Sequence, residues 1–357
     1  MGCNLNMNYI ERTQELLHQV KVLAKRTKKI SGFTIGNTAK VDKAGFYFTP
    51  LRETSLMICA GVIVYSEMQA IEVVKIIDGK VDYILVDAEK KVSDEMSLKG
   101  EPANVERAVR ERISKSTLWI YKGNDLAVDA VDGLITQLTK KEIQGVGGKK
   151  VAILGAGNLG CKLALKLVER GGHVYLTRRD KTKLNAIVKS LNIIKPEHTV
   201  AKVHGLTNNQ KAAFKADILI GASQGVPLIT ESMIRNLNSN PIVIDAGKGT
   251  LDKKAILVSQ KLGIKIFRVD ISAAFEGLIR KLWATERIVE QRMGRRTLNE
   301  IKIVSGGILG HLEEIVVDNI RQPRIIYGMA NGLGDFIRRP SLVQEKMIQQ
   351  LAKQIAQ

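Results

Sequence analysis

The chain has 357 residues, a length that favours two domains, each with its own hydrophobic core. Its 55 Lys and Arg residues against 36 Asp and Glu give a net charge of +19, which favours anionic small-molecule partners, while only 4% aromatic residues argue against single-stranded nucleic acid. The three cysteines lack paired spacing, so we expect neither a disulfide framework nor a metal site. No apolar run of about 18 residues and no secretory signal occur, so we expect no membrane span and a cytoplasmic protein.

The first part of the chain predicts a small α/β layer. Residues 8–29 have apolar positions at helical spacing, and residues 31–40, which contain Gly and Thr, are predicted as a loop. Pro50 favours a turn, after which the continuous apolar run at 56–65 is typical of a buried strand. The following segments predict a helix, a strand, a helix and a strand, in the order 66–80, 81–91, 104–116 and 117–123.

A second domain follows a predicted long helix at 125–141. From residue 151, strands and helices alternate as in a parallel sheet with crossover helices, up to a strand at 263–270. From about Ala273 the pattern is mostly helical to the end. An apolar stripe on the last helix favours packing on a second subunit, hence a homodimer; its residues are Leu342, Met347, Leu351 and Ile355.

The stretch VAILGAGNLG, residues 151–160, places G-x-G-x-x-G between a short apolar strand and an amphipathic helix, the context of a dinucleotide site. Gly155 allows the tight turn, Gly157 lets a pyrophosphate approach the backbone, and Gly160 lets the helix pack on the strand. The N–H groups at the helix start favour the phosphates. The loop is therefore predicted to bind the cofactor, together with Asn158 and Leu159.

The next strand ends in TRRD, about twenty residues after the loop, where an acidic residue would hold the ribose of NAD. Thr177, Arg178 and Arg179 occupy this place, and paired guanidinium groups suit the 2′-phosphate of NADP. NADP is therefore the expected cofactor. NAD is the less favoured alternative. It stays open because Asp180 follows and is able to reach a ribose diol.

Four stretches, taken in order, resemble a superfamily of two-domain dehydrogenases. They are KGNDLAVDAVDGLITQL, the glycine loop continued to TRRDKTK, ADILIGASQGVPLITESMI with PIVIDAG, and FRVDISAAFE with VSGGILGHLEEIVVDNI. The superfamily contains shikimate dehydrogenases, amino-acid dehydrogenases, and the methylene-tetrahydrofolate and methylene-tetrahydromethanopterin dehydrogenases. The glycine-loop stretch is similar to the tetrahydromethanopterin type, and the last two stretches are similar to the folate type.

The resemblance implies an α/β substrate domain at 1–124, a bridging helix and doubly wound Rossmann domain at 125–275, and C-terminal helices at 276–357 that return to the first domain. It implies that Ser223 and Gln224 lie beside the nicotinamide ribose. The chain departs from the family in the first domain, which has neither the Tyr-x-x-x-Lys of the folate type nor the lysine pattern of the shikimate type. The fold and the cofactor therefore carry over better than the substrate.

Charged residues follow the strand YILVD, at the edge where open α/β sheets bind ligands. A lysine stabilises developing charge and a carboxylate relays a proton. Lys90 is the candidate, with Asp87 as its partner. If the strand continues, Lys90 and Lys91 point to opposite sides, so at most one of them faces the cleft. The alternative is a strand that simply leaves the core into a solvated loop.

Two acidic residues of the bridging helix, Asp125 and Asp129, are further catalytic candidates. Asn124 and Asp125 alternatively only cap this helix. His311 is placed at the start of a helix beside Gly310, where a histidine is more often structural.

The favoured function is an NADP-dependent dehydrogenase that transfers a hydride to or from a one-carbon unit on a reduced pterin, a bulky and often anionic substrate that suits the positive chain. One alternative is an NAD(P)-dependent dehydrogenase of a small hydroxy or amino acid, as in the shikimate branch. The other is a catalytically silent sensor that kept the NADP loop and lost the catalytic groups.

Overall fold

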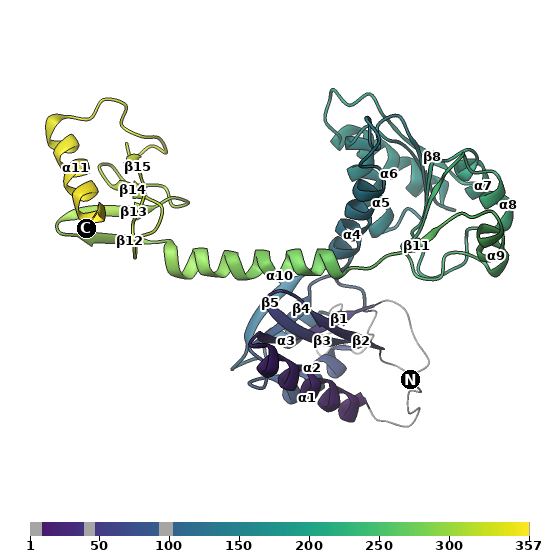
Figure 1. Ribbon diagram of the computed structural model, residues 1–357, viewed down its shortest axis with the longest axis horizontal. Coiled ribbons are helices and arrows are strands. Elements are labelled where there is room, and N and C mark those ends of the chain that lie inside the picture. Colours follow the sequence, from purple (N-terminus) through teal and green to yellow (C-terminus); the bar gives the residue numbers. More distant parts are fainter. Residues whose placement is uncertain (1–8, 39–46, 93–102, 357) are drawn as a thin grey trace. The chain divides into compact units, whose positions relative to one another are not determined.

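The computed structural model describes residues 9–38, 47–92 and 103–356, and the chain divides into two compact units at Leu278 and Ile279 (Figure 1). The first unit contains two sheets, and the second contains a smaller third sheet. Among the helices of these residues, none is both long and apolar enough to cross a membrane.

The first sheet has five strands in the order β2–β3–β1–β4–β5, and only β2 runs antiparallel to its neighbour. The apolar faces of α1, α2 and α3 pack against it around the buried Phe33, Ile58 and Ile84, as predicted for an α/β layer. The elements are α1 (Tyr9–Thr27), β1 (Ile30–Asn37), β2 (Tyr47–Glu53), β3 (Met57–Val64), α2 (Glu67–Ile77), β4 (Tyr83–Asp87), α3 (Val105–Arg110) and β5 (Thr117–Tyr121).

The prediction of a loop at 31–40 is wrong, because most of this segment forms β1, the central strand of the sheet. Its glycines concealed the strand pattern, since glycine is normally depleted in strands. Here they make room for neighbouring side chains. A Cβ on Gly32 would lie 2.4 Å from Met57 Sδ, and one on Gly36 would lie 2.5 Å from Ile63 Cδ1.

The turn predicted at Pro50 is also wrong, because Pro50 lies within β2. This strand is at the edge of the sheet, and its pairing with β3 is irregular between Thr49 and Arg52. A proline is tolerated at such a position because no ladder N–H is needed there.

The second sheet confirms the predicted doubly wound Rossmann architecture. Its six parallel strands have the order β11–β10–β9–β6–β7–β8, so the chain reverses direction across the sheet between β6 and β9. Side chains of β6 alternate between two cores, one under α4, α5 and α6 and the other under α7, α8 and α9. The elements are α4 (Gly123–Leu138), β6 (Lys150–Leu154), α5 (Asn158–Glu169), β7 (His173–Thr177), α6 (Lys181–Ile194), β8 (Val203–Leu206), α7 (Asn209–Ala213), β9 (Ile218–Gly221), α8 (Glu231–Arg235), β10 (Ile242–Asp245), α9 (Lys253–Lys261) and β11 (Ile266–Arg268).

Helix α10 (Ser272–Arg287) follows the second sheet, and its first two turns contact the first sheet. Arg52 Nη1 donates to Ser272 Oγ at 3.2 Å, and the Ser55 N–H donates to Glu276 Oε2 at 2.8 Å. These contacts tie the beginning of α10 to the end of β2.

The prediction of a mostly helical chain after Ala273 is wrong. A short π-helical segment (Ile288–Arg292) precedes four strands in the order β12–β13–β14–β15, followed by α11 (Leu342–Ala356). Asn299 and Glu300 form the turn between β12 and β13, both with positive φ. Hairpin turns of this kind favour Asn-Gly, and the glutamate concealed the signal. The strands are β12 (Arg295–Leu298), β13 (Ile301–Ser305), β14 (Ile315–Val317) and β15 (Ile326–Met329).

Two further expectations in the second unit are corrected. His311 does not begin a helix; it lies before a turn that leads into β14. The apolar stripe of α11 packs within its own unit, because Leu351 is fully buried and Met347 and Ile355 are partly buried against the third sheet. That stripe is therefore not available for a second subunit, although Leu342 is exposed.

Candidate active site

The glycine loop lies between β6 and α5 at the point where the strand order reverses. Gly155 has a φ of +120°, and a Cβ there would lie 2.9 Å from the Ala222 carbonyl oxygen. A Cβ on Gly160 would lie only 2.0 Å from the Gly155 carbonyl oxygen. A Cβ on Gly157, in contrast, has nothing within 4 Å. Gly157 is therefore open at the N-terminus of α5, where free N–H groups favour an anion.

The two arginines that follow β7 have different surroundings. Arg178 Nη1 donates to the Ala156 carbonyl oxygen at 2.7 Å, so this side chain holds the glycine loop. Its Nε is buried and has no partner among the described residues. Arg179 is exposed, whereas Thr177 is buried and its carbonyl accepts from the Ala156 N–H. Of these two arginines, Arg179 is therefore the one whose side chain is exposed.

Asp180 is occupied by a structural role. Its carboxylate caps α6 by accepting from the Lys183 N–H at 3.0 Å. This contact gives Asp180 a structural role at the start of α6.

The loops after β9 and β10 pack against each other at the same sheet edge. Ser223 Oγ donates to the Val226 carbonyl oxygen at 2.7 Å, and Gln224 is exposed. Gly247 lies so close that a Cβ would be 1.7 Å from the Ser223 carbonyl oxygen. Ser223 and Gln224 thus lie in the loop after β9, the strand that pairs with β6.

Asp245, which the sequence did not single out as a site residue, organises the loop after β10. It is buried and accepts hydrogen bonds from the N–H groups of Gly249 and Thr250 and from Thr250 Oγ1. Burial alone would raise the pKa of Asp245, but these hydrogen bonds and the charge of Arg268 hold it below its usual value. The sequence signal was a strand ending in Asp-x-Gly.

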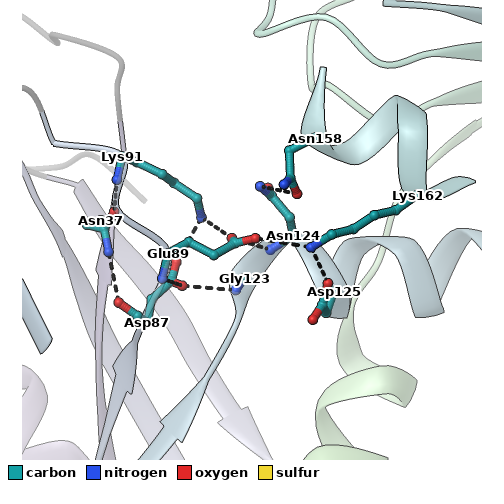
Figure 2. A network of polar contacts seen from close by, with 9 residues as sticks. All are labelled: Asn37, Asp87, Glu89, Lys91, Gly123, Asn124, Asp125, Asn158 and Lys162. Atoms are coloured by element: carbon teal, nitrogen blue, oxygen red, sulfur yellow. Dashed lines mark hydrogen bonds and ion pairs between the residues drawn. The ribbon is translucent and has the colours of Figure 1, made fainter. Parts of the chain in front are cut away.

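A group of charged side chains lies at the carboxyl ends of β1, β4 and β5 (Figure 2). Lys91 Nζ lies 2.8 Å from Asp87 Oδ2 and 2.7 Å from Glu89 Oε2. Asn37 at the end of β1 fixes this segment from both sides, since its Nδ2 donates to the Asp87 carbonyl and its Oδ1 accepts from the Lys91 N–H. Lys90 is exposed, so Lys91 is the lysine that faces the carboxylates.

The first residues of α4 join this group to the cofactor loop. Asp87 Oδ1 accepts from the Gly123 N–H at 3.1 Å, and Glu89 Oε2 accepts from the Asn124 N–H at 2.9 Å. These are N–H groups that a helix start leaves without helical partners. The Asn124 Nδ2 then donates at 3.1 Å to the Oδ1 of Asn158, a residue of the glycine motif at the start of α5 (Figure 2).

Lys162, one turn into α5, makes the second connection. Its Nζ pairs with Asp125 and lies 3.4 Å from Glu89 Oε1. Burial alone would lower the pKa of Lys162, but the two carboxylates outweigh burial and raise it. Burial alone would raise the pKa of Glu89, but the hydrogen bonds from Lys91 and Asn124 and the charges of both lysines lower it. Both groups are therefore charged at neutral pH.

We call Asp87, Glu89, Lys91, Asp125 and Lys162 the carboxylate cluster. The sequence anticipated Asp87 and Asp125, but it preferred Lys90 to Lys91 and missed the contribution of Lys162. Asp129 does not join the cluster; it is exposed and pairs with Lys166 at 3.2 Å.

Tyr121, at the end of β5, is a further residue that the sequence did not indicate. Burial and the nearby charges of Asp87 and Glu89 raise its pKa well above the usual value, so its hydroxyl is neutral. Among the described residues, no three His, Cys, Asp or Glu side chains form a group that could hold a metal ion.

Comparison with known proteins finds a family model that matches part of the chain. Residues 150–249 match the family described as NADP oxidoreductase, coenzyme F420-dependent. The chain is similar to the solved structure of a dipicolinate synthase from Bacillus halodurans, with 17% identity, coverage of 72% of this chain and 97% of that one, and a TM-score of 0.36. It is also similar to a hetero-hexameric glutamate dehydrogenase from Thermus thermophilus, with 11% identity, 73% and 69% coverage, and a TM-score of 0.43. No curated protein matches.

The strand order, the glycine loop and the family match together define residues 150–249 as an NAD(P)-binding Rossmann domain of the oxidoreductase class. The resemblance to dehydrogenases is thus confirmed at the level of this domain and its cofactor.

Proposed function

We propose that the chain is an NADP-dependent dehydrogenase whose substrate reacts beside the carboxylate cluster. The observation that carries this proposal is the direct connection between the cluster and the cofactor helix. Asn124 contacts Asn158, and Lys162 contacts both Glu89 and Asp125. A catalytic group must lie close to the cofactor, and these contacts bring the first sheet to the start of α5.

The described residues fit the cofactor. The open space at Gly157 and the N–H groups of α5 would hold the pyrophosphate, and Arg179 would hold the 2′-phosphate. When bound, NADP supplies a hydride acceptor or donor. Arg178 keeps the loop in shape through the Ala156 carbonyl.

The charge of the cluster favours substrates that become more positive as they are oxidised. Three carboxylates (Asp87, Glu89, Asp125) and two ammonium groups (Lys91, Lys162) give a sum of −1. Loss of a hydride from a methylene-tetrahydropterin leaves a cationic methenyl group, which a net negative site stabilises. The reduced pterin with a one-carbon unit is therefore the favoured substrate class.

The same charge supports a second candidate, an amino acid, because oxidation of an amine gives a cationic iminium group. A hydroxy acid fits less well, since its oxidation gives a neutral carbonyl group and creates no positive charge for the site to stabilise. For an amino acid or a hydroxy acid a proton must also leave the nitrogen or oxygen, and Lys91, held between two carboxylates, is positioned to exchange it.

Glu89→Gln tests the role of the cluster. This change makes the sum of charges zero but keeps an oxygen for the Asn124 N–H, so we expect NADPH binding to remain and kcat/KM to fall about 100-fold. Asp129→Asn is the matched control, because Asp129 is on the adjoining helix, is exposed and lies outside the cluster. Equal activities for the two variants would refute the assignment of the cluster.

The substrate class is tested by measuring NADP reduction with methylene-tetrahydropterins, amino acids and hydroxy acids. Turnover of the pterin supports the favoured function, and turnover of an amino acid alone supports the second candidate. Tight binding of NADPH without turnover of any compound would support a catalytically silent sensor and overturn the proposed enzyme.

A further inference from the structure

A basic pocket lies at the amino ends of the strands of the first sheet, whereas the carboxylate cluster lies at their carboxyl ends. Ser31 lies at the beginning of β1 and Asp82 directly precedes β4, whereas Asn37 and Asp87 end these same two strands. The pocket has a volume of about 630 Å³, within the range of about 300–1,000 Å³ typical of small-molecule sites. Its lining residues with ionisable side chains are His18, Lys21, Lys25, Lys29, Lys80 and Asp82.

Separate elements bring the lysines of this pocket together. His18, Lys21 and Lys25 are spaced at i, i+3 and i+7, so they share one face of α1. Lys80 comes from the turn after α2, where Gly79 has a φ of +72°. Lys29 follows the end of α1. The fold therefore concentrates positive charge in one concave region, where low-dielectric walls strengthen its field.

The acidic groups nearby, Asp82 and Glu53, compensate only part of this charge, because four lysines line the pocket. Asp82 Oδ2 accepts from both the Ser31 N–H and the Ser31 Oγ, each at 2.7 Å. Lys29 has an acidic partner, Glu53, at 2.7 Å. Within the described ranges, Lys21, Lys25 and Lys80 form no ion pair. Lys21 and Lys25 are also one helical turn apart, so they repel each other unless an anion lies between them.

We propose that this pocket binds a small molecule with several phosphate groups. Three ammonium groups without acidic partners match a ligand with several negative charges better than a single carboxylate, and lysine is a common phosphate ligand. Among the described residues, no Phe, Tyr or Trp lines the pocket, so it offers no large ring on which a base would stack. Recognition therefore rests on the phosphates. The site is separate from the nucleotide loop and independent of the proposed dehydrogenase activity.

Inorganic tripolyphosphate is the probe for a calorimetric titration of the full chain. The triple variant Lys21→Gln, Lys25→Gln, Lys80→Gln removes the pocket charges. The control Lys189→Gln, Lys211→Gln, Lys253→Gln removes three exposed lysines of the second sheet's helices and lowers the net charge by the same amount. We expect the pocket variant to weaken binding about tenfold or more and the control to change it less than about twofold.

A second measurement locates the probe on the chain. Lysine acetylation followed by mass spectrometry should show protection of Lys21, Lys25 and Lys80 by tripolyphosphate, and no protection of Lys189 or Lys253. Equal weakening in the two triple variants, or protection spread over all lysines, would mean a general charge effect and overturn the proposal. So would a short RNA that binds the pocket more tightly than tripolyphosphate, because the ligand would then be a nucleic acid.

Discussion

The glycine loop offers a pair of substitutions that separate packing from cofactor binding. In Gly160→Ala, the new Cβ would lie 2.0 Å from the Gly155 carbonyl oxygen and must move to at least 3.0 Å, and the obstacle is backbone. We expect this change to lower the free energy of unfolding by about 1–3 kcal/mol, as overpacking does. In Gly157→Ala, the Cβ enters space that is open within 4 Å, and the φ of −94° suits alanine. The free energy of unfolding should therefore change by less than about 1 kcal/mol.

Gly157→Ala should change the affinity for the cofactor strongly, although it changes the free energy of unfolding little. If a pyrophosphate occupies the open space, a methyl group there displaces it from the N–H groups of α5, and the Kd for NADPH should rise about tenfold or more. Urea unfolding without nucleotide gives the first quantity, and fluorescence titration with NADPH gives the second. Unchanged NADPH binding by Gly157→Ala would refute the loop as the pyrophosphate site. Wild-type stability of Gly160→Ala would refute the packing argument.

Three further predictions address other parts of the chain. Arg179→Gln should raise the Kd for NADPH about tenfold and leave that for NADH unchanged, whereas Arg178→Gln should weaken both, because Arg178 holds the loop; titration with both nucleotides decides. Asp245, whose pKa is low in the folded state, should add stability that is complete above about pH 4 and is lost as the pH falls through that lower pKa. In urea unfolding, the free energy of unfolding of Asp245→Asn should therefore depend less on pH below about pH 4 than that of the wild type. An equal dependence on pH would contradict this role of Asp245. Leu351→Ala should destabilise the second unit by about 2–5 kcal/mol without changing NADPH binding, as followed by separate unfolding and binding measurements.

The Rossmann sheet was predictable because its signals are local. Each strand is a short apolar run, each crossover helix is amphipathic, and the glycine motif lies where a strand gives way to a helix. Gly155, Gly157 and Gly160 each have the geometry that the motif requires. The third sheet had no such signals, because the φ angles of Asn299 and Glu300 depend on tertiary context and Glu is not a typical residue for that turn.

The candidate site was only partly predictable, because its contacts join distant segments. The charged end of β4 was visible in the sequence, but the choice between Lys90 and Lys91 depends on how the chain leaves the strand. A strand continued through both residues would place them on opposite faces. In the structure β4 ends at Asp87, and Asn37 of β1 binds the N–H of Lys91. No pattern around residue 90 reports a partner more than fifty positions away.

The cluster also shows why structural and catalytic explanations of its residues need not compete. The carboxylates of Asp87 and Glu89 satisfy the first N–H groups of α4, a helix whose N-cap residue Lys122 makes no side-chain cap. The same contacts fix where Asn124 and Asp125 meet α5. The capping role therefore sets the distance between the lysine-bearing end of β4 and the cofactor helix. A substitution that removes the cap should disturb both. Lys91→Gln, compared with Lys90→Gln, keeps both capping carboxylates and is therefore the probe of proton transfer; because Lys91 pairs with these carboxylates, unchanged NADPH binding is the check that the cap is intact.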